Sequence, residues 1–249
     1  MRFFFRKLHR WLGLLMVVQI IAWMASGLYF SIFPIEEIRG EHLVKKPESL
    51  EAKGLSQMSS PIELNRQLEK HFGPGWELTS LSLVSHAGQM AWRVGGNAHG
   101  VAFRRLVSGD GTGVLPVLSA AEAQQVARGW LLDATEPREI EWLESASPGS
   151  EIRGRNFPVW KVSFDEPESL NLYLDPWTGE ILARRTTRWR VFDFFWMLHV
   201  MDFETRDDFN HPLLQIAALL GLFIALSGVI FWALTTPLLR NKNRIHSTN

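Results

Sequence analysis

The sequence contains no cysteine. This absence excludes disulfide bonds, thiolate zinc sites, iron–sulfur clusters and haem attached covalently through cysteine. An excess of charge is also lacking, because 26 basic side chains balance 26 acidic ones. No nucleic-acid partner is therefore expected from the overall charge. Histidine, with eight residues, is the strongest ligand for haem or a soft metal that remains in quantity.

Motifs of the common enzyme classes are missing as well. The sequence has no nucleophile elbow, no HExxH zinc motif, no Walker loop and no dinucleotide-binding glycine pattern. The glycine-rich segments at 95–100 and 108–113 precede no clear helix start, so we interpret them as loops rather than phosphate sites. Asp175 and Glu180 are expected to satisfy backbone donors in a turn rather than to act as acid and base. The missing motifs therefore disfavour a stand-alone enzyme.

Two long apolar runs lie near the ends of the chain. The first extends from Trp11 to Ile35 with Gln19 as its only strongly polar residue, and the second, Leu213 to Leu239, has no charged residue. Each is long enough for a transmembrane helix of about 20 residues. A secretory signal peptide is the competing interpretation of the first run. The run is longer than a signal core of about 7–15 residues, however, and no A-x-A site closes it, so we expect an uncleaved anchor.

Charged residues flank the two runs asymmetrically. Basic residues lie at the outer ends of the chain: Arg2, Arg6, Lys7, Arg10, Arg240, Lys242 and Arg244. Acidic residues lie on the inner sides of the runs: Glu36, Glu37, Glu41, Asp202, Glu204, Asp207 and Asp208. By the positive-inside rule, both termini are expected in the cytoplasm and the middle of the chain in the periplasm of a bacterium. The predicted location is the bacterial inner membrane.

Small residues recur at helical spacing within the runs. Both runs contain a Ser-Gly pair, at 26–27 and at 227–228. Residues spaced by four are also small, namely Ala22 and Ser26 in the first run and Ala217, Gly221 and Ala225 in the second. Such stripes allow another helix to approach closely. They predict a packed helix interface, and dimerisation through these faces would supply four helices.

The middle of the chain contains two helix signals. Ser60-Pro61-Ile62-Glu63 and Ser119 with Glu122 both match a capping box at a helix start. Gly73-Pro74-Gly75 ends the first helix. The apolar stripe of the first helix consists of Leu64, Leu68 and Phe72, and that of the second of Ala120, Ala123, Ala127, Trp130 and Leu131.

Each predicted helix is followed by alternating apolar residues, which indicate antiparallel strands. They are Met90, Trp92, Val94, Val101 and Phe103 after the first helix, and Trp160, Val162, Phe164, Leu170, Leu172 and Leu174 after the second. The turns repeat too, because SGDGTGVL (108–115) matches the end of LDPWTGEIL (174–182). Gly113 and Gly179 then occupy equivalent positions, where a tight turn requires positive φ. The middle is therefore predicted to be an α+β domain with an internal repeat.

Two parts of the sequence resemble known families. The segments FPVWKVSF (157–164) and LNLYLDPWTGEIL (170–182), with an Asp-x-x-Thr-Gly-Glu turn, resemble a PepSY domain, and the first unit is a degenerate copy with Gly109 in place of Asp175. The flanks KLHRWLGL (7–14), LHVMDF (198–203) and ALSGVIFW (225–232) resemble the PepSY-associated transmembrane family. The resemblance implies an α+β membrane protein with two transmembrane helices, an interfacial helix and a periplasmic domain of two PepSY-like helix-plus-antiparallel-strand repeats.

The expected domains follow from this comparison. A cytoplasmic tip and the first transmembrane helix occupy 1–35, and the tandem PepSY-like domain occupies 36–185. An interfacial aromatic helix and loop at 186–211 precede the second transmembrane helix at 212–239, and 240–249 form a cytoplasmic tail.

The resemblance also implies two alternative functions. Larger members of the family include ferric-siderophore reductases that carry b-type haem on histidines, and they have four or more spans where this chain has two. One implied function is thus an electron-transfer or accessory subunit of a membrane redox or iron-reduction system, with b-type haem shared in a homodimer or with a partner membrane subunit. Soluble PepSY domains are linked to the control of extracellular peptidases. The alternative is therefore a membrane-anchored binding module that regulates a peptidase or docks another envelope protein.

Three histidines are candidate haem ligands. His9 lies in the Leu-His-Arg-Trp motif of the first span, where the alternative is an interfacial histidine among basic residues. His199 lies in an aromatic segment too short to span and is expected to share a helix face with Phe195, Leu198 and Asp202. His211 directly precedes the second span and is either its partner or a helix-start residue. His42, His71, His86, His99 and His246 have no ligand spacing and are interpreted as surface or structural.

The length of the first span constrains these ligands. From His9 to the end of the span is about 36 Å at the α-helical rise, whereas the hydrocarbon core is about 30 Å thick. His9 and His199 are therefore expected at opposite faces and cannot bind one iron. A bis-histidine haem would need His199 with His211, or the same histidine from two protomers.

Overall fold

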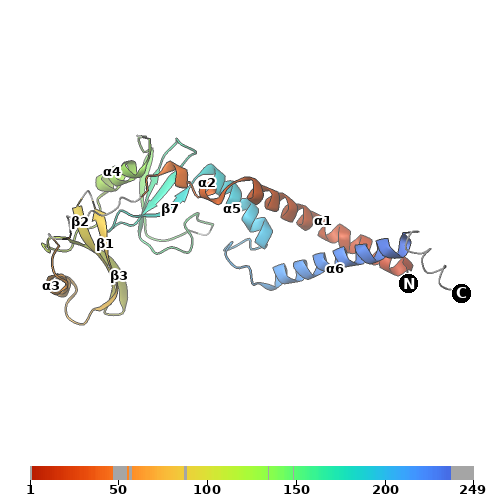
Figure 1. Cartoon of the computed structure of the whole chain (residues 1–249), viewed down its shortest axis with the longest axis horizontal. Helices are drawn as coiled ribbons and strands as arrows, with labels where there is room; N and C mark the ends of the chain where they lie inside the picture. The colour runs from red at the N-terminus through yellow and green to blue at the C-terminus, as the bar shows by residue number, and fades with distance from the viewer. Residues whose placement is uncertain are drawn as a thin grey trace, which may run out of the picture. The chain divides into compact units, whose positions relative to one another are not determined.

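The computed structural model describes residues 2–46, 55, 58–86, 89–133, 135–147 and 149–236 (Figure 1). The basic tail at 240–249, which contains Arg240, Lys242, Arg244 and His246, lies outside the described residues. The chain divides into two compact units, Met1–Ile35 with Arg190–Asn249, and Glu36–Trp189. Each unit has its own core, and we describe the two separately.

The first unit contains α1 (Arg2–Ile32), most of α5 (Thr187–Val200) and α6 (Pro212–Thr235). Within the described part of the chain, the stretches Arg6–Ile32 and Pro212–Ala233 are long and apolar enough to cross a membrane. The basic tip predicted to precede the first span is itself part of α1, since arginine and lysine are good helix formers. α1 ends three residues earlier than the predicted run, because Pro34 disfavours the helical conformation in the residue before it.

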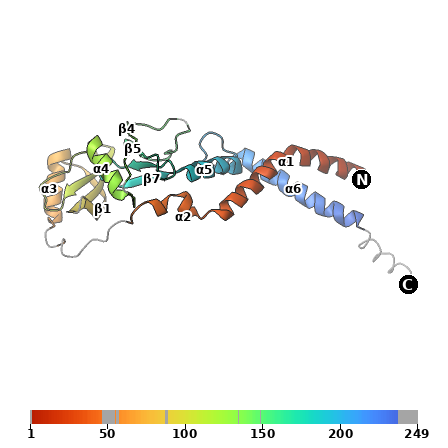
Figure 2. The same ribbon diagram turned by 90° about the horizontal axis from the view of Figure 1, so that it is seen from above.

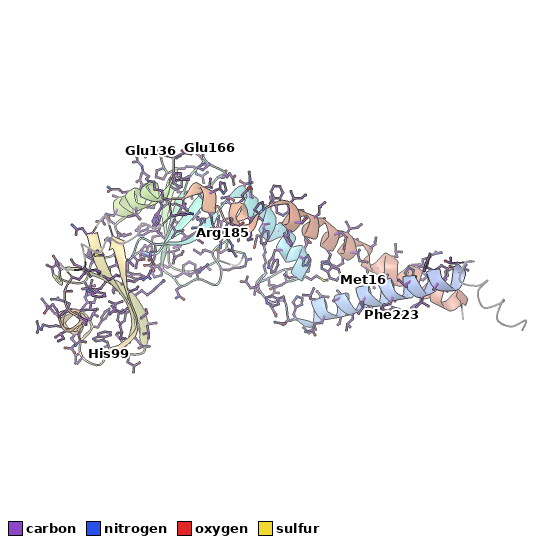
Figure 3. All side chains as sticks on the ribbon, viewed as in Figure 1. Met16, His99, Glu136, Glu166, Arg185 and Phe223 are labelled. Carbon is purple, nitrogen blue, oxygen red and sulfur yellow. The ribbon has the colours of Figure 1, made fainter. Side chains whose placement is uncertain are left out.

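α1 and α6 run in opposite directions, so that α6 ends beside the start of α1 (Figures 1 and 2). Met16, Ala217 and Ile224 are buried between them, with Leu12, Ile20, Trp23, Leu220 and Met201 packed around this cluster. A Cβ at Gly221 would lie 3.4 Å from the Trp23 ring, so the small residue admits the indole. Met16, labelled in Figure 3, lies in this contact, whereas Phe223 is exposed.

The small residues of α6 are therefore used inside the chain. Ala217 and Gly221 face α1, and Ala225, the third member of the predicted stripe, is exposed. On α1, Ser26 is fully buried against a residue of α5 rather than left open for a second copy. The predicted packed helix interface is confirmed between α1 and α6 of one chain. Dimerisation through the small-residue faces stays a prediction.

The C-terminal end of α5 is capped by side chains. The last carbonyls of a helix have no partner within the helix. Here the Leu198 carbonyl accepts from Gln19 Nε2 at 2.9 Å, and the His199 carbonyl accepts from Trp23 Nε1 at 2.8 Å. The single polar residue of the first run is thus explained, since an unpaired carbonyl would be costly in an apolar layer.

The second unit consists of two halves, each a helix followed by an antiparallel sheet. Before them lie α2 (Ile35–Ile38) and a short 3-10 helix, η1 (Glu41–Leu43). The first half has α3 (Pro61–Phe72) and a sheet in the order β1 (Glu77–His86), β2 (Gln89–Ala98) and β3 (Val101–Ser108). The second half has α4 (Ala120–Trp130) and a sheet in the order β4 (Glu139–Leu143), β5 (Val159–Ser163), β6 (Asn171–Leu174) and β7 (Ile181–Arg185).

Each half has its own apolar core. The first core contains Leu64, Leu68, Val94, Ala98, Phe103 and Val107. The second contains Val44, Ala127, Leu131, Val162, Phe164, Leu170, Leu172 and Leu174. The opposite face of the second sheet is also covered, because Val159, Tyr173 and Ala183 pack with Ile152. The prediction from alternating apolar residues at 160–164 and 170–174 thus missed the second buried face of this sheet.

Charged pairs join the two halves. Asp175 is fully buried, its Oδ1 accepts from the backbone N–H groups of Trp177 and Thr178 at 3.0 Å, and its Oδ2 lies 2.8 Å from Arg104 Nη2. Glu180 pairs with Arg93 of β2. Asp175 therefore satisfies backbone donors of the turn, as predicted, whereas the Glu180 carboxylate instead links the turn to the first half through Arg93.

Several local predictions differ from the structure. The strand β1 was missed because ELTSLSLVSH is largely polar, and β4 was missed because EIEWL is only five residues long. Ala120 is exposed rather than part of the buried stripe. The Ser119–Glu122 capping box is complete, but at Ser60 only the serine makes its bond, because Glu63 instead binds Arg66 and Gln67.

The two repeated turns also differ. Gly179 has positive φ (67°) as predicted, but in the first turn the positive φ is at Gly111 (78°) and not at Gly113. A Cβ at Gly109 would lie 2.3 Å from the Met90 carbonyl oxygen, so no aspartate fits at that position. Asp110 takes over the capping role one residue later and accepts from Thr112 N–H at 3.0 Å. Hydrogen bonds from Ser108 and Thr112 lower the pKa of Asp110.

Candidate functional site

His9 of α1 is paired with a serine of α6. Its Nδ1 lies 2.8 Å from Ser227 Oγ. The same hydroxyl donates to the carbonyl of Ile224, three residues earlier in the helix, at 2.9 Å. A Cβ at Gly228 would lie 3.4 Å from His9 Cε1, so the glycine beside the serine gives the imidazole room to lie against α6.

His199 of α5 is paired with a serine of α1 in the same way. Its Nδ1 lies 2.8 Å from Ser26 Oγ, and that hydroxyl donates to the carbonyl of Trp23 at 3.1 Å. The structure thus gives each of the two repeated Ser-Gly pairs the same role, because each serine holds a histidine of another helix.

The hydrogen bonds are compatible with one arrangement of protons in both pairs. A serine hydroxyl has a single proton. Each hydroxyl lies within hydrogen-bond distance of a backbone carbonyl and of imidazole Nδ1. Where the serine donates to the carbonyl, the histidine donates from Nδ1–H and keeps a free lone pair at Nε2. Neither Nε2 has a hydrogen-bond partner among the described residues.

Aromatic rings surround His199. The ring of Trp196 stacks on the imidazole with 6.5 Å between centroids and 8° between planes, and the Phe30 ring lies 5.7 Å away. Burial lowers the pKa of His199, which favours its neutral form. Together with the capping bonds from Gln19 and Trp23, these contacts fix the backbone and the ring of His199 to α1.

The third candidate, His211, is engaged differently. It is the N-cap residue of α6, and its Nε2–H donates to the Val200 carbonyl at 2.8 Å. It therefore closes the loop between α5 and α6, and only Nδ1 remains as a ligand atom. The lone-pair nitrogen is thus Nε2 in His9 and His199 but Nδ1 in His211.

Asp202 does not share the helix face of His199, contrary to the prediction. α5 ends at Val200, and Met201 has positive φ (57°), so the chain leaves the helix before Asp202. Asp202 caps the following loop, where its oxygens accept from the backbone N–H groups of Glu204, Thr205, Asp207 and Asp208 and from the Thr205 hydroxyl. These bonds, first the one from the Thr205 hydroxyl, lower the pKa of Asp202. The carboxylate is a structural group of the loop.

His9 and His199 cannot share a ligand. His199 binds α1 at Ser26, and Ser26 lies 17 positions after His9 in the sequence, or about 25 Å at the helical rise. The two imidazoles therefore form separate sites at different depths of the helix pair.

The residues fit an axially ligated haem better than a bare metal ion. Across the described ranges, no group of three or more histidine, cysteine, aspartate or glutamate side chains is placed to hold a metal ion. A haem needs only one or two axial ligands. An imidazole whose Nδ1–H is hydrogen-bonded, and whose Nε2 is free, is the form in which histidine binds a metal. Gly13, one turn after His9, adds open space, because a Cβ there would meet no atom within 4 Å.

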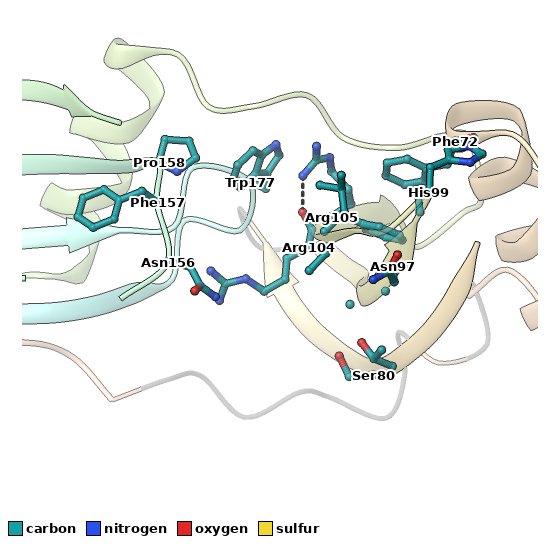
Figure 4. Close-up of a pocket in the computed structure, with 17 residues that line it drawn as sticks. Phe72, Ser80, Asn97, His99, Arg104, Arg105, Asn156, Phe157, Pro158 and Trp177 are labelled. Carbon is teal, nitrogen blue, oxygen red and sulfur yellow. Dashed lines mark hydrogen bonds between the residues drawn. The ribbon is translucent and has the colours of Figure 1, made fainter. Parts of the chain in front are cut away.

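A second candidate site lies in the second unit (Figure 4). It is a cavity of about 940 Å³ beside β3. The first half contributes Phe72, Asn97, His99 and Arg105, and the second half contributes Asn156, Phe157, Pro158 and Trp177. The guanidinium of Arg105 lies 4.4 Å from the centroid of Trp177 and 5.8 Å from that of Phe72. Desolvation by burial lowers the pKa of Arg105, and the charge of Asp175 opposes this shift.

The sequence alone did not reveal either serine as a partner of a histidine, although it showed the repeated Ser-Gly pair. The partners are 173 and 218 residues apart, and no local pattern connects them. The cavity was missed because β3 was predicted only from Val101 and Phe103, and the two arginines that follow, Arg104 and Arg105, were not considered.

A comparison with protein families gives one match. The family model described as PepSY-associated TM region matches residues 6–247, nearly the whole chain. Neither a curated protein nor a solved structure matches the chain.

Proposed function

Because the chain belongs to the family of the PepSY-associated TM region, we propose that it binds b-type haem and serves as an electron-transfer or accessory subunit of a membrane redox or metal-reduction system. The family match and the two apolar helices make the chain a membrane protein in contact with the lipid bilayer. The observation that carries the haem proposal is the pair of hydroxyls that leave Nε2 of His9 and His199 as free ligand nitrogens.

The proposed ligands are His9 and His199, each at its own site. Since about 25 Å of helix separates them, a bis-histidine haem would take the same histidine from two copies of the chain. A homodimer would then hold one haem near each end of the helix pair. Bound haem supplies reversible one-electron chemistry at its iron. His9 and His199 would hold the haem through Nε2, and Ser227 and Ser26 would keep their Nδ1 protonated.

The proposed orientation has both termini in the cytoplasm and the second unit in the periplasm. It is supported by the antiparallel arrangement of α1 and α6, because the contact of His9 with Ser227 brings the start of one helix beside the end of the other. The two helix–sheet halves are then PepSY-like repeats on the periplasmic side. Arg6, Lys7 and Arg10 near His9 would face the cytoplasmic lipid headgroups.

An absorbance measurement tests the proposal. The full chain is purified in mild detergent with haem supplied, and reduced-minus-oxidised spectra are recorded. We expect b-type bands that disappear in the double variant His9→Ala/His199→Ala. His71→Ala serves as the matched control, because His71 is exposed on α3 in the other unit, and it should keep the bands. A colourless wild-type protein, or a double variant with full bands, would refute the haem assignment.

The alternative function is a membrane-anchored binding module. The observation that favours it is the cavity beside β3, which lies in the second unit and involves none of the candidate haem ligands. This alternative predicts a partner that still binds the double histidine variant.

A further inference from the structure

The cavity beside β3 reaches the outer edge of the first sheet. Its lining includes residues of β1 (79–80), of β2 (95–98) and of β3 (101–105), so it extends across the sheet (Figure 4). Consecutive side chains of a strand point to opposite faces of the sheet. Because five consecutive residues of β3 line the cavity, residues of both faces of this edge strand contribute to it.

Part of this edge is already covered by the chain. β3 pairs with β2 on its inner side. On its outer side, Ser108 N–H donates to the Gly113 carbonyl at 2.9 Å, and the Leu106 carbonyl accepts from Leu115 N–H at 2.8 Å. The backbone groups of even-numbered residues therefore point to the outer edge. Segment 113–115 covers this edge at 106–108 only.

The remaining outer edge, at Ala102 and Arg104, faces the cavity. By the same alternation, both residues direct their N–H and C=O groups outward. The Arg104 carbonyl accepts from its neighbour Arg105 at 2.7 Å. Among the described residues, the outward groups of Ala102 have no hydrogen-bond partner. Natural proteins usually cover or block such an edge, because it is a template for another strand.

The charge of the cavity is positive. Arg104 and Arg105 line it together with His99, and its lining includes no aspartate or glutamate among the described residues. Asp175, which is fully buried, pairs with Arg104 from beneath the cavity surface. One carboxylate is therefore set against the two guanidinium groups of Arg104 and Arg105. Arg105 lies over Trp177, and its one hydrogen bond goes to a backbone carbonyl. An acidic ligand is therefore favoured over a basic one.

We propose that an extended, acidic segment of another protein binds here by adding a strand to the edge of β3 at Ala102 and Arg104. Backbone hydrogen bonds would hold the segment, and Arg104 and Arg105 would bind its carboxylates. A second copy of this chain is a poor occupant, because pairing two β3 edges would bring the same arginines together. The proposal gives the binding-module alternative a partner class and does not depend on haem.

Synthetic peptides test the ligand class. Fluorescently labelled octapeptides of alternating threonine and glutamate, or of alternating threonine and lysine, are titrated with the full chain in nanodiscs and followed by anisotropy. We expect the glutamate peptide to bind at least about tenfold more tightly than the lysine peptide, because its carboxylates can form two or more charge-assisted hydrogen bonds that the lysine peptide cannot form. Equal binding of the two peptides, or no binding of the glutamate peptide, would overturn the proposal.

Three variants and two N-methylated peptides test the strand addition. Ala102→Pro removes the outward N–H and leaves the bonds to β2 intact, because edge strands accept proline where the N–H faces outward. We expect about tenfold weaker binding of the glutamate peptide, whereas Ala102→Ser should bind as wild type. Arg105→Ser should weaken binding by a similar factor. A peptide strand has two edges, and only one of them would bond to β3. N-methylation of alternate residues along that edge should abolish binding, whereas N-methylation along the opposite edge should not.

Folding of the variants is checked by tryptophan fluorescence, which should be unchanged. If Arg105→Ser weakens binding and neither Ala102→Pro nor peptide N-methylation does, the peptide is held by side chains alone and strand addition is refuted.

Discussion

The two histidine–serine pairs of the first unit have the same kind of hydrogen-bond contact and differ in their surroundings. In both, a serine hydroxyl lies within hydrogen-bond distance of the carbonyl three residues earlier and of imidazole Nδ1. His9 lies against Gly228 of α6, with open space beside Gly13. His199 lies between rings, on a helix end capped by Gln19 and Trp23. The two pairs therefore share the contact on which the proposed imidazole tautomer depends. They differ in how firmly the backbone around the histidine is held.

The largest effect is expected from removing one histidine at a time. His9→Ala and His199→Ala should each lose about half of the haem per chain, because the two imidazoles belong to separate sites. Haem content by pyridine haemochrome assay, relative to protein, measures this. Complete loss in either single variant would show that both histidines serve one site and would break the comparison.

The next effect is expected from the serines. Ser26→Ala and Ser227→Ala remove the acceptor for Nδ1–H, and loss of such a supporting partner typically costs about 10–100-fold in affinity. Each should weaken haem binding at its own histidine only, as measured by haem titration in the background of the other histidine's alanine variant. Ser31→Ala is the matched control, since this serine of α1 bonds only to the Leu28 carbonyl. If the control weakens binding equally, the serines act through the helix and not through the imidazoles.

A smaller, one-sided effect is expected from the glycines. Leucine at 228 would extend into the space of the His9 ring, whereas a Cβ at Gly27 meets nothing within 4 Å. Gly228→Leu should weaken haem binding at His9 by about tenfold, and Gly27→Leu should leave His199 unchanged. Equal effects of the two variants would contradict the described packing.

The smallest effect concerns the caps of α5. Trp23→Phe and Gln19→Leu each leave a carbonyl without its donor, which should lower the free energy of unfolding by roughly 1–3 kcal/mol. Thermal unfolding in detergent measures this, and the haem at His9 should be unaffected. Unaltered stability in both variants would mean that water or lipid headgroups reach these carbonyls.

Local patterns predicted much of the fold. Charge-free runs gave both membrane helices, serine with glutamate three residues later gave the start of α4, and a glycine turn placed the positive φ of Gly179. The strand β1 was missed because its serines hide the alternation of Leu81 and Leu83. The first repeated turn was misplaced because a contact between Gly109 and the Met90 carbonyl, which no local pattern reveals, shifts the capping aspartate by one residue.

The candidate site, like the fold, was predicted only in part from the sequence. The three histidines were selected as candidates from the sequence, His199 because an imidazole in an apolar aromatic segment is unusual, and their role as ligands stays a prediction. Their different roles could not be found, since they depend on partners in other helices. Ser227 and Ser26 lie far along the chain from His9 and His199, and His211 is engaged through a backbone carbonyl.

The tautomers of His9 and His199 are measurable without haem. The full chain, with ¹⁵N-labelled histidine, is studied by NMR in nanodiscs, and the two signals are assigned with His9→Ala and His199→Ala. Protonation at Nδ1 in both rings, lost on changing Ser227 or Ser26 to alanine, is the predicted result. Protonation at Nε2 in either ring would place the proton on the proposed ligand atom and contradict the account.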